Sequence, residues 1–131
     1  MTDLMRQSMP LCETLGIRTV SASAEEVVGE MDWAAERCTT LGLLHGGALM
    51  ALADSVGATC AFLNLPEGAG TSTIESKTNL LRGVREGTTV RAVARPLHVG
   101  GSTIVVETEL RDGEGRLVAK TTQTQAVLKP R

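Results

Sequence analysis

Asp54 is the acid whose surroundings most strongly suggest a chemical role. It is the one carboxylate in the stretch LGLLHGGALMALADSVGATC, residues 41–60. On a helix, its neighbours three and four positions away are small or apolar and cannot pair with a carboxylate: Met50, Ala51, Gly57 and Ala58. Because an unpaired buried carboxylate is costly, helix stability does not explain this acid. Asp54 is therefore either a functional acid or a structural one, partly exposed or paired with a distant arginine.

The residues that precede Asp54 form a second candidate group. His45, Gly46 and Gly47 stand where a helix would begin. The first peptide N–H groups of a helix have no partner inside it, and that end carries partial positive charge. Glycine also lets a ligand approach the backbone closely. Such a helix start can polarise a carbonyl group and hold a developing oxyanion.

The spacing of these two groups predicts a dimer. Asp54 lies eight residues beyond Gly46, which is roughly 12 Å along a helix at ~1.5 Å per residue. One helix cannot bring its acid to a carbon held at its own start. Two antiparallel helices can, so we expect a symmetric dimer with two composite sites.

Other residues capable of chemistry have weaker support. His45 could act as a general base, but a lone histidine beside glycines more often packs or hydrogen-bonds. Cys60 fits a small core residue better than a nucleophile, and Glu75 is the second candidate acid. His98 is expected at the surface, and with two histidines in the chain no metal site is expected.

The predicted elements give an α+β fold. One strong helix runs from Gly46 to about Leu63, and its apolar residues recur nearly all round, which indicates a buried helix. A short helical segment broken by Pro10 is expected within residues 1–15. Strands joined largely by glycine turns complete a sheet that curls around the helix, at residues 17–23, 26–33, 71–81, 88–99, 102–111 and 116–128, with a loop at 34–44.

Composition excludes several classes of protein. The 131 residues suit one domain, residues 1–131. The net charge of −2 comes without a basic block, so no nucleic-acid partner is expected. No apolar run reaches the ~18 residues of a membrane span, and three cysteines do not suggest a disulfide framework. We expect a cytoplasmic protein that has no membrane partner.

The motif HGGALMALADSVGA, preceded by LGLL and followed by LLRGVREG and GRLVAKTTQTQAVL, resembles the hotdog-fold acyl-CoA thioesterases. The most similar branch is the phenylacetate-degradation (PaaI-like) type, which includes one class of 4-hydroxybenzoyl-CoA thioesterase. The resemblance covers about residues 12–128. It implies a curved antiparallel sheet around a central helix, sheets paired into dimers, and dimers paired into homotetramers.

The resemblance also implies a reaction. An acyl thioester of coenzyme A would be hydrolysed to acid and thiol, with no cofactor because coenzyme A is part of the substrate. Asp54 would attack the thioester carbon or activate water. The Gly46 N–H would polarise the carbonyl from the opposite subunit, and His45 would shape the site. A thiolate leaves readily, so an acid and a helix start suffice.

Further site positions follow from the same match. Thr39 stands where relatives often have an asparagine or glutamine, and Thr73 best matches a serine or threonine that reaches toward the acid. Arg82-Gly83-Val84 replaces the usual Arg-Pro-Val turn. For the substrate we expect contacts from the helix and from the loop beyond it, at Gly47, Met50, Arg82 and Arg85, the two arginines meeting phosphates.

Two alternatives remain open at this point. The chain could be a non-catalytic module that binds or senses acyl-CoA on the same fold. A hydratase or dehydratase of this fold is disfavoured, because His45 precedes the helix and no histidine follows Asp54 on it. The acyl group, and coenzyme A against a carrier protein as the thiol, are left undetermined by the sequence.

Overall fold

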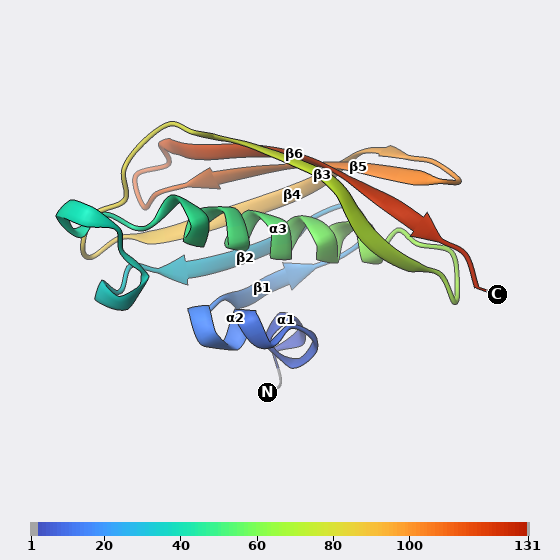
Figure 1. The fold of residues 1–131 in the computed structure, drawn as a ribbon, viewed down its shortest axis with the longest axis horizontal. Coiled ribbons are helices and arrows are strands. Elements are labelled where there is room, and N and C mark those ends of the chain that lie inside the picture. The colour runs from blue at the N-terminus through green and yellow to red at the C-terminus, as the bar shows by residue number, and fades with distance from the viewer. Residues whose placement is uncertain (1–2, 131) are drawn as a thin grey trace.

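The computed structural model describes residues 3–130 and shows a curved sheet wrapped around one long helix (Figure 1). The sheet has six antiparallel strands in the order β1-β2-β4-β5-β6-β3. The α+β prediction of an antiparallel sheet around a central helix is confirmed. The strands are β1 (Arg18–Ala22), β2 (Val27–Asp32), β3 (Gly70–Leu80), β4 (Thr89–Val99), β5 (Thr103–Arg111) and β6 (Leu117–Leu128), and the central helix is α3 (Gly46–Phe62).

The core lies between α3 and the concave face of the sheet. Alternate residues of β5 and β6 are buried, as expected for strands with one face on the core. On α3 the buried side chains include Leu49, Leu52, Val56 and Cys60, which recur at helical spacing. The sheet therefore fixes which side of α3 faces inward.

The prediction that α3 is buried all round is wrong along one stripe. Met50 and Phe62 are 41% and 59% exposed, Asp54 is also exposed, and Ala58 is half-buried. These four residues stand four positions apart and share one side of the helix. The apolar composition of α3 does not reveal this stripe, because the sheet covers one side of the helix only. Asp54 lies in the middle of it.

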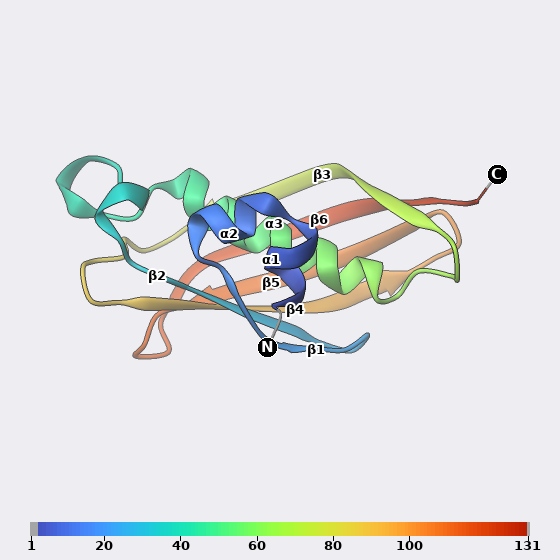
Figure 2. The same ribbon diagram turned by 90° about the horizontal axis from the view of Figure 1, so that it is seen from below.

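Two short helices, α1 (Leu4–Ser8) and α2 (Pro10–Leu15), fall within the predicted N-terminal segment. Pro10 begins α2 and Gly16 ends it with a left-handed φ of 67°, a conformation that favours glycine. Both helices pack against α3, and α1 also contacts β1 (Figure 2). No helix within residues 3–130 combines the length and apolar character needed to cross a bilayer.

The strand β3 forms one edge of the sheet and is exposed along most of its length. Within residues 3–130 it pairs with β6 alone. Its register shifts between Thr73 and Glu75, so that Ile74 bulges and is 62% exposed. The predicted loop at 34–44 contains two 3-10 turns, Ala35–Arg37 and Thr40–Gly42. The loop leads directly into the start of α3.

Candidate functional site

Asp54 has a hydrogen-bond partner that sequence neighbours did not reveal. Gln123 of β6 donates from Nε2 to Asp54 Oδ1 at 3.0 Å. The Gln123 side chain is fully buried, whereas Asp54 is exposed on α3. The sequence does hold a signal for Gln123. It is a polar residue at a position of the strand where the alternation of apolar and polar residues predicts a side chain that faces the core. Asp54 is exposed, as the structural reading also allowed, and it forms no ion pair with an arginine within residues 3–130.

The contact belongs to a longer polar chain. Gln123 Nε2 also donates to Gln125 Oε1 at 2.9 Å, and the Thr73 hydroxyl donates to the same oxygen at 2.6 Å. Gln125 Nε2 donates to Thr71 Oγ1 at 3.1 Å. Thr73 therefore reaches Asp54 only through two amide side chains. The expected direct approach of Thr73 to the acid is not present.

Gly57 explains part of the small-residue face around Asp54. A Cβ atom at Gly57 would overlap Gln123 Oε1 and would lie 3.2 Å from Thr108 Oγ1. The absent side chain therefore makes room for the Gln123 amide beside Asp54. The close approach to this face of the helix is made by a buried side chain of the same chain.

At the start of α3, His45 caps the helix. Its Nδ1 accepts a hydrogen bond from the Gly47 N–H at 2.8 Å, so the ring proton of the neutral imidazole is assigned to Nε2. Gly47 therefore has no free N–H to offer a substrate, and its contact with substrate stays a prediction. The Gly46 N–H, in contrast, makes no hydrogen bond to any residue of 3–130.

Gly46 opens into a hollow of about 310 Å³. Leu80 of β3 lies over it, with Cδ1 2.7 Å from the place of a Gly46 Cβ. Thr39 is on the rim, so the structure brings this predicted site residue to the helix start. The remaining lining residues are mostly leucines and the β3–β4 connection: Leu43, Leu44, Leu49, Leu81, Arg82 and Gly83.

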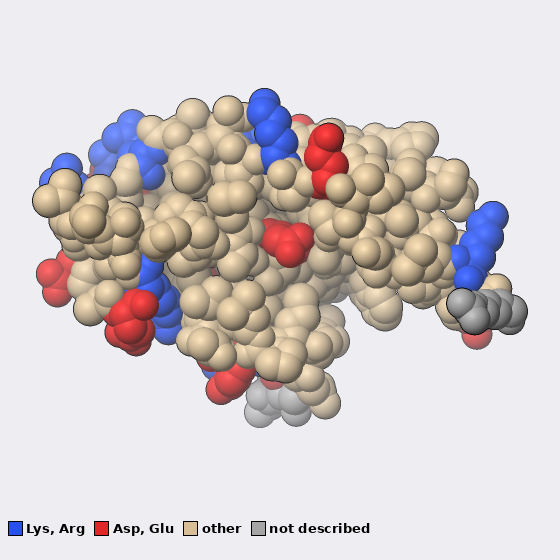
Figure 3. All heavy atoms as spheres, in the orientation of Figure 1, with Lys and Arg blue, Asp and Glu red and all other residues tan. Residues whose placement is uncertain are grey.

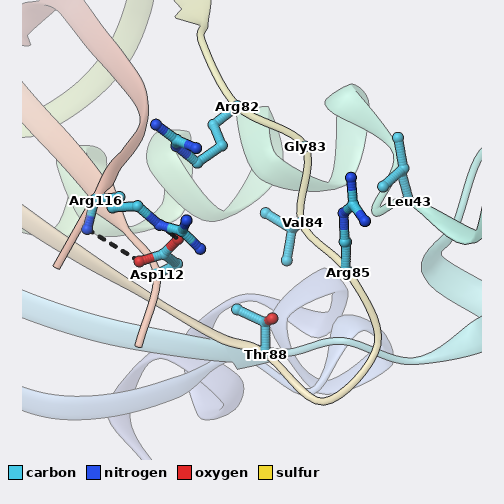
Figure 4. Close-up of a pocket in the computed structure, with 8 residues that line it drawn as sticks. All are labelled: Leu43, Arg82, Gly83, Val84, Arg85, Thr88, Asp112 and Arg116. Carbon is cyan, nitrogen blue, oxygen red and sulfur yellow. Dashed lines mark hydrogen bonds and ion pairs between the residues drawn. The ribbon is translucent and has the colours of Figure 1, made fainter. Parts of the chain in front are cut away.

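A second hollow of about 490 Å³ adjoins the first and shares Leu43, Arg82 and Gly83 with it. Figure 4 shows Arg82 and Arg116 on one side of this hollow and Arg85 beside Leu43 on the other. Asp112 pairs with Arg116 at 2.9 Å. Arg82 and Arg85 form no ion pair within the described chain, and Arg116 is an arginine that the sequence analysis did not assign here.

The two predicted groups lie apart in one chain. Gly46, His45, Thr39 and Arg82 gather at the start of α3, whereas Asp54 stands eight residues further on. Figure 3 shows basic atoms at the end of the molecule that carries the β3–β4 connection in Figure 1, and a small acidic patch among uncharged residues near the middle of that face. A single chain therefore does not bring Asp54 to the Gly46 N–H.

Comparison with known proteins decides the family. The family model described as Thioesterase superfamily matches residues 41–119, more than half of the chain. The chain belongs to this superfamily. It is 37% identical to ComA2 of Bacillus subtilis (strain 168) over 121 residues, which are 91% of this chain and 94% of ComA2.

Two further comparisons agree. The 1,4-dihydroxy-2-naphthoyl-CoA hydrolase of Escherichia coli (strain K12) is 39% identical over 87 residues, 66% of this chain and 63% of that enzyme. The crystal structure of a mutant of the thioesterase PA1618 of Pseudomonas aeruginosa superimposes with a TM-score of 0.88 and 31% identity, covering 95% of this chain and 91% of that one. The hotdog fold and the assignment as a thioester hydrolase are confirmed.

Three further chemical groups of this thioesterase, Cys60, Glu75 and His98, lie outside both the polar chain at Asp54 and the hollow at Gly46. Burial raises the pKa of the Cys60 thiol to about 11, so it stays protonated near neutral pH, in agreement with a core role. Glu75 is exposed on β3 and outside the polar chain, and His98 is exposed on β4. Across residues 3–130 no three acidic, histidine or cysteine side chains are grouped as metal ligands would be.

Proposed function

We propose that the protein hydrolyses acyl-CoA thioesters at two composite sites of a homodimer. Each site would combine Asp54 of one protomer with the partner subunit's Gly46. The observation that carries this proposal is that one chain leaves both the Gly46 N–H and Asp54 without the other group that the reaction needs. The Gly46 N–H has no partner among residues 3–130, and Gly46 lines a hollow. Asp54 is held by Gln123 and is exposed on an uncovered stripe of α3.

The chemistry needs few groups. The Gly46 N–H would donate to the thioester carbonyl oxygen and stabilise the oxyanion, assisted by the positive end of the α3 dipole. Asp54 would attack the carbonyl carbon and form a mixed anhydride, which water then hydrolyses to release the acid and restore the carboxylate. Alternatively, Asp54 would remove a proton from a water molecule that attacks the carbonyl carbon directly. In both routes the C–S bond breaks and the thiolate leaves, because a thiol with a pKa of ~8.5 is a good leaving group. His45 would keep the helix start in place through its bond to Gly47.

The arginine-lined hollow supports coenzyme A as the thiol component. It shares Arg82 with the hollow at Gly46, so one extended ligand can run from the helix start to the arginines. Arg82 and Arg85, together with Arg116, would meet its phosphates, as arginine binds phosphate oxygens in a fixed geometry. The name of the Escherichia coli relative, a CoA hydrolase, agrees with this choice.

An apolar hollow of about 360 Å³ supports an apolar acyl group. It begins at Ala58, one turn beyond Asp54, and continues to Phe62. The hollow is also lined by Leu4 of α1, by Met9 just after α1, and by Thr71 near the start of β3. Met50 would contact the substrate at the other side of Asp54 on the same exposed stripe.

The dimer would form through β3. This strand is an exposed sheet edge, and pairing of two such edges about a two-fold axis gives one continuous sheet with antiparallel helices. We further propose that two such dimers pair through a separate surface into a tetramer, because each β3 edge is already paired within its dimer.

A thiol-release assay tests the proposal directly. The substrates are aryl and medium-chain acyl-CoA esters, together with acyl-carrier-protein thioesters. We expect release of free thiol from the CoA esters, and a loss of at least about 100-fold in kcat for Asp54→Asn, as for removal of a general base or nucleophile.

Glu75→Gln is the matched control, because Glu75 is the second candidate acid, and it should leave thiol release unchanged. Wild-type protein that binds the esters but releases no thiol would instead establish the non-catalytic binding module. A loss confined to Glu75→Gln would move the acid to β3.

A further inference from the structure

We infer that Thr73, Gln125 and Gln123 act as positioning residues that fix the carboxylate of Asp54. This inference rests on the proposed function, because it concerns the same acid. Gln123 makes the direct contact, from Nε2 to Asp54 Oδ1. Gln125 and Thr73 follow Gln123 in the chain of hydrogen bonds, and they set the orientation of the Gln123 amide.

The direction of every hydrogen bond in this chain is determined. The amino group of the Gln123 amide faces Asp54, and Asp54 Oδ1 accepts its hydrogen bond. The second hydrogen of the same amino group goes to Gln125 Oε1, which also accepts from the Thr73 hydroxyl. Gln125 Nε2 in turn donates to Thr71. A flipped amide at Gln123 would put an oxygen against both Asp54 and Gln125 Oε1.

The two glutamines of the polar chain are held in a rigid part of the fold. Gln123 and Gln125 are 0% and 1% exposed, and β6 lies inside the sheet between β5 and β3. By contrast, Asp54 stands on an exposed stripe where its side chain would otherwise sample several rotamers. The buried amide therefore transfers the fixed position of the sheet to an exposed acid on the helix.

This arrangement has a cost that core packing alone does not explain. Gln123 Oε1 and Thr108 Oγ1 are buried without a hydrogen-bond partner among the residues described, and a buried unpaired polar group destabilises a protein. Gly57 leaves the space that the Gln123 amide occupies. An apolar side chain at position 123 would avoid the unpaired oxygen but would leave Asp54 without its donor.

The hydrogen bond from Gln123 also gives the two carboxylate oxygens of Asp54 different roles. Gln123 holds Oδ1, while Oδ2 makes no hydrogen bond within residues 3–130. Oδ2 is thus the oxygen available to the thioester carbon or to a water molecule. Holding a reacting atom in one place raises the rate without requiring a stronger nucleophile.

The first test is Gln123→Met, which keeps the length of the side chain and removes its donors. We expect kcat to fall roughly 10- to 100-fold, the factor for a lost hydrogen bond to a charged group, while KM changes less than about 2-fold because Gln123 is buried away from substrate. Thr121→Val is the matched control. Thr121 is buried on the same face of β6 as Gln123. Its hydroxyl bonds to that of Thr78, and neither residue belongs to the polar chain that ends at Asp54. The kcat of Thr121→Val should be unchanged.

The second test places Gln123→Met in the Asp54→Asn background. If Gln123 acts through Asp54, the double variant should retain the same residual turnover as Asp54→Asn alone. Multiplied losses in the double variant would overturn the inference, as would an unchanged kcat in Gln123→Met. Loss of turnover in Asp54→Asn, measured in parallel, keeps a failure of the inference distinct from a failure of the proposed function.

The third test does not depend on a buried substitution. Thr73→Val removes the exposed outer donor of the chain and retains a residue that fits a strand. We expect kcat to fall about 3-fold, the effect of a neutral hydrogen bond, at unchanged KM. A wild-type kcat in folded Thr73→Val protein would contradict the inference even if Gln123→Met did not fold.

Discussion

At the scale of single residues, the acid and the helix start could be recognised from the sequence, whereas the support of the acid could not. Asp54 and Gly46 stand within one short stretch, so their types and spacing are visible together. Gln123 lies 69 residues from Asp54, and only the pairing of β6 within the sheet brings the two side chains together. The occupation of the Gly47 N–H by His45 also depends on a side-chain orientation that the sequence does not specify.

Cysteine reactivity is a prediction at this scale. Burial raises the pKa of Cys60 to about 11 and also raises that of Cys12, so neither thiol should react with an alkylating reagent in the native protein at pH 7.5. Cys38 is half-buried and should be modified first. Mass spectrometry of protein alkylated before and after unfolding measures the order. Rapid native modification of Cys60 would contradict its place in the core.

At the scale of elements, alternation and glycine turns identified the strands, helix-forming apolar residues identified the long helix, and Pro10 identified the break in the N-terminal segment. Each of these signals is local in the sequence. The uncovered stripe of α3 was missed, since composition shows that a helix is apolar but not which side a sheet covers. The 3-10 turns at 35–42 were also missed, because their short bonds leave no periodic pattern.

The attachment of α1 gives a prediction on pH dependence. Burial alone would raise the pKa of Asp3, but hydrogen bonds from Thr19, Arg6 and Met5 to the carboxylate bring it below 3.8. A carboxyl pKa that is lower in the folded state stabilises the fold above the unfolded pKa, and this stability is lost as the pH falls through the folded value. Asp3→Ala should lower the free energy of unfolding by about 1 kcal/mol at pH 7.

The measurement is urea unfolding between pH 7 and pH 2.5. The difference between wild type and Asp3→Ala should shrink as the pH falls below about 4. Glu25→Ala serves as the control, because Glu25 is exposed and forms no hydrogen bond from its side chain to the described residues. A difference between wild type and Asp3→Ala that is independent of pH would show that the carboxylate charge of Asp3 contributes nothing.

At the scale of the whole molecule, the two edges of the sheet differ in what lies beside them. The edge strand β1 contacts α1, whereas β3 is exposed along most of its length and carries Thr71 and Thr73, which bond to Gln125 of β6. The sequence predicted a dimer from the separation of Asp54 and Gly46. The single chain agrees with the premise of that prediction, since it leaves these two residues apart.

A charge on the β3 edge should therefore separate the protomers. Ile74→Lys places a lysine at the exposed bulge of β3, and edge lysines oppose strand pairing. We expect sedimentation to show monomers, and thiol release to fall about 10-fold or more and to recover as protein concentration rises. Val20→Lys is the control, because Val20 is an exposed residue at the register shift of the opposite edge strand, β1. Monomers that hydrolyse at the wild-type rate would refute the composite site.

Leu80 ends β3, and its methyl group lies against Gly46. The strand that we propose as the dimer edge therefore also carries the side chain that covers the peptide at the start of α3. A displacement of β3 by even a fraction of a side-chain width changes how far that peptide is shielded. With the proposed pairing through β3, Leu80 would couple assembly to the access of a ligand to Gly46, and a substitution on the surface of this strand should alter both.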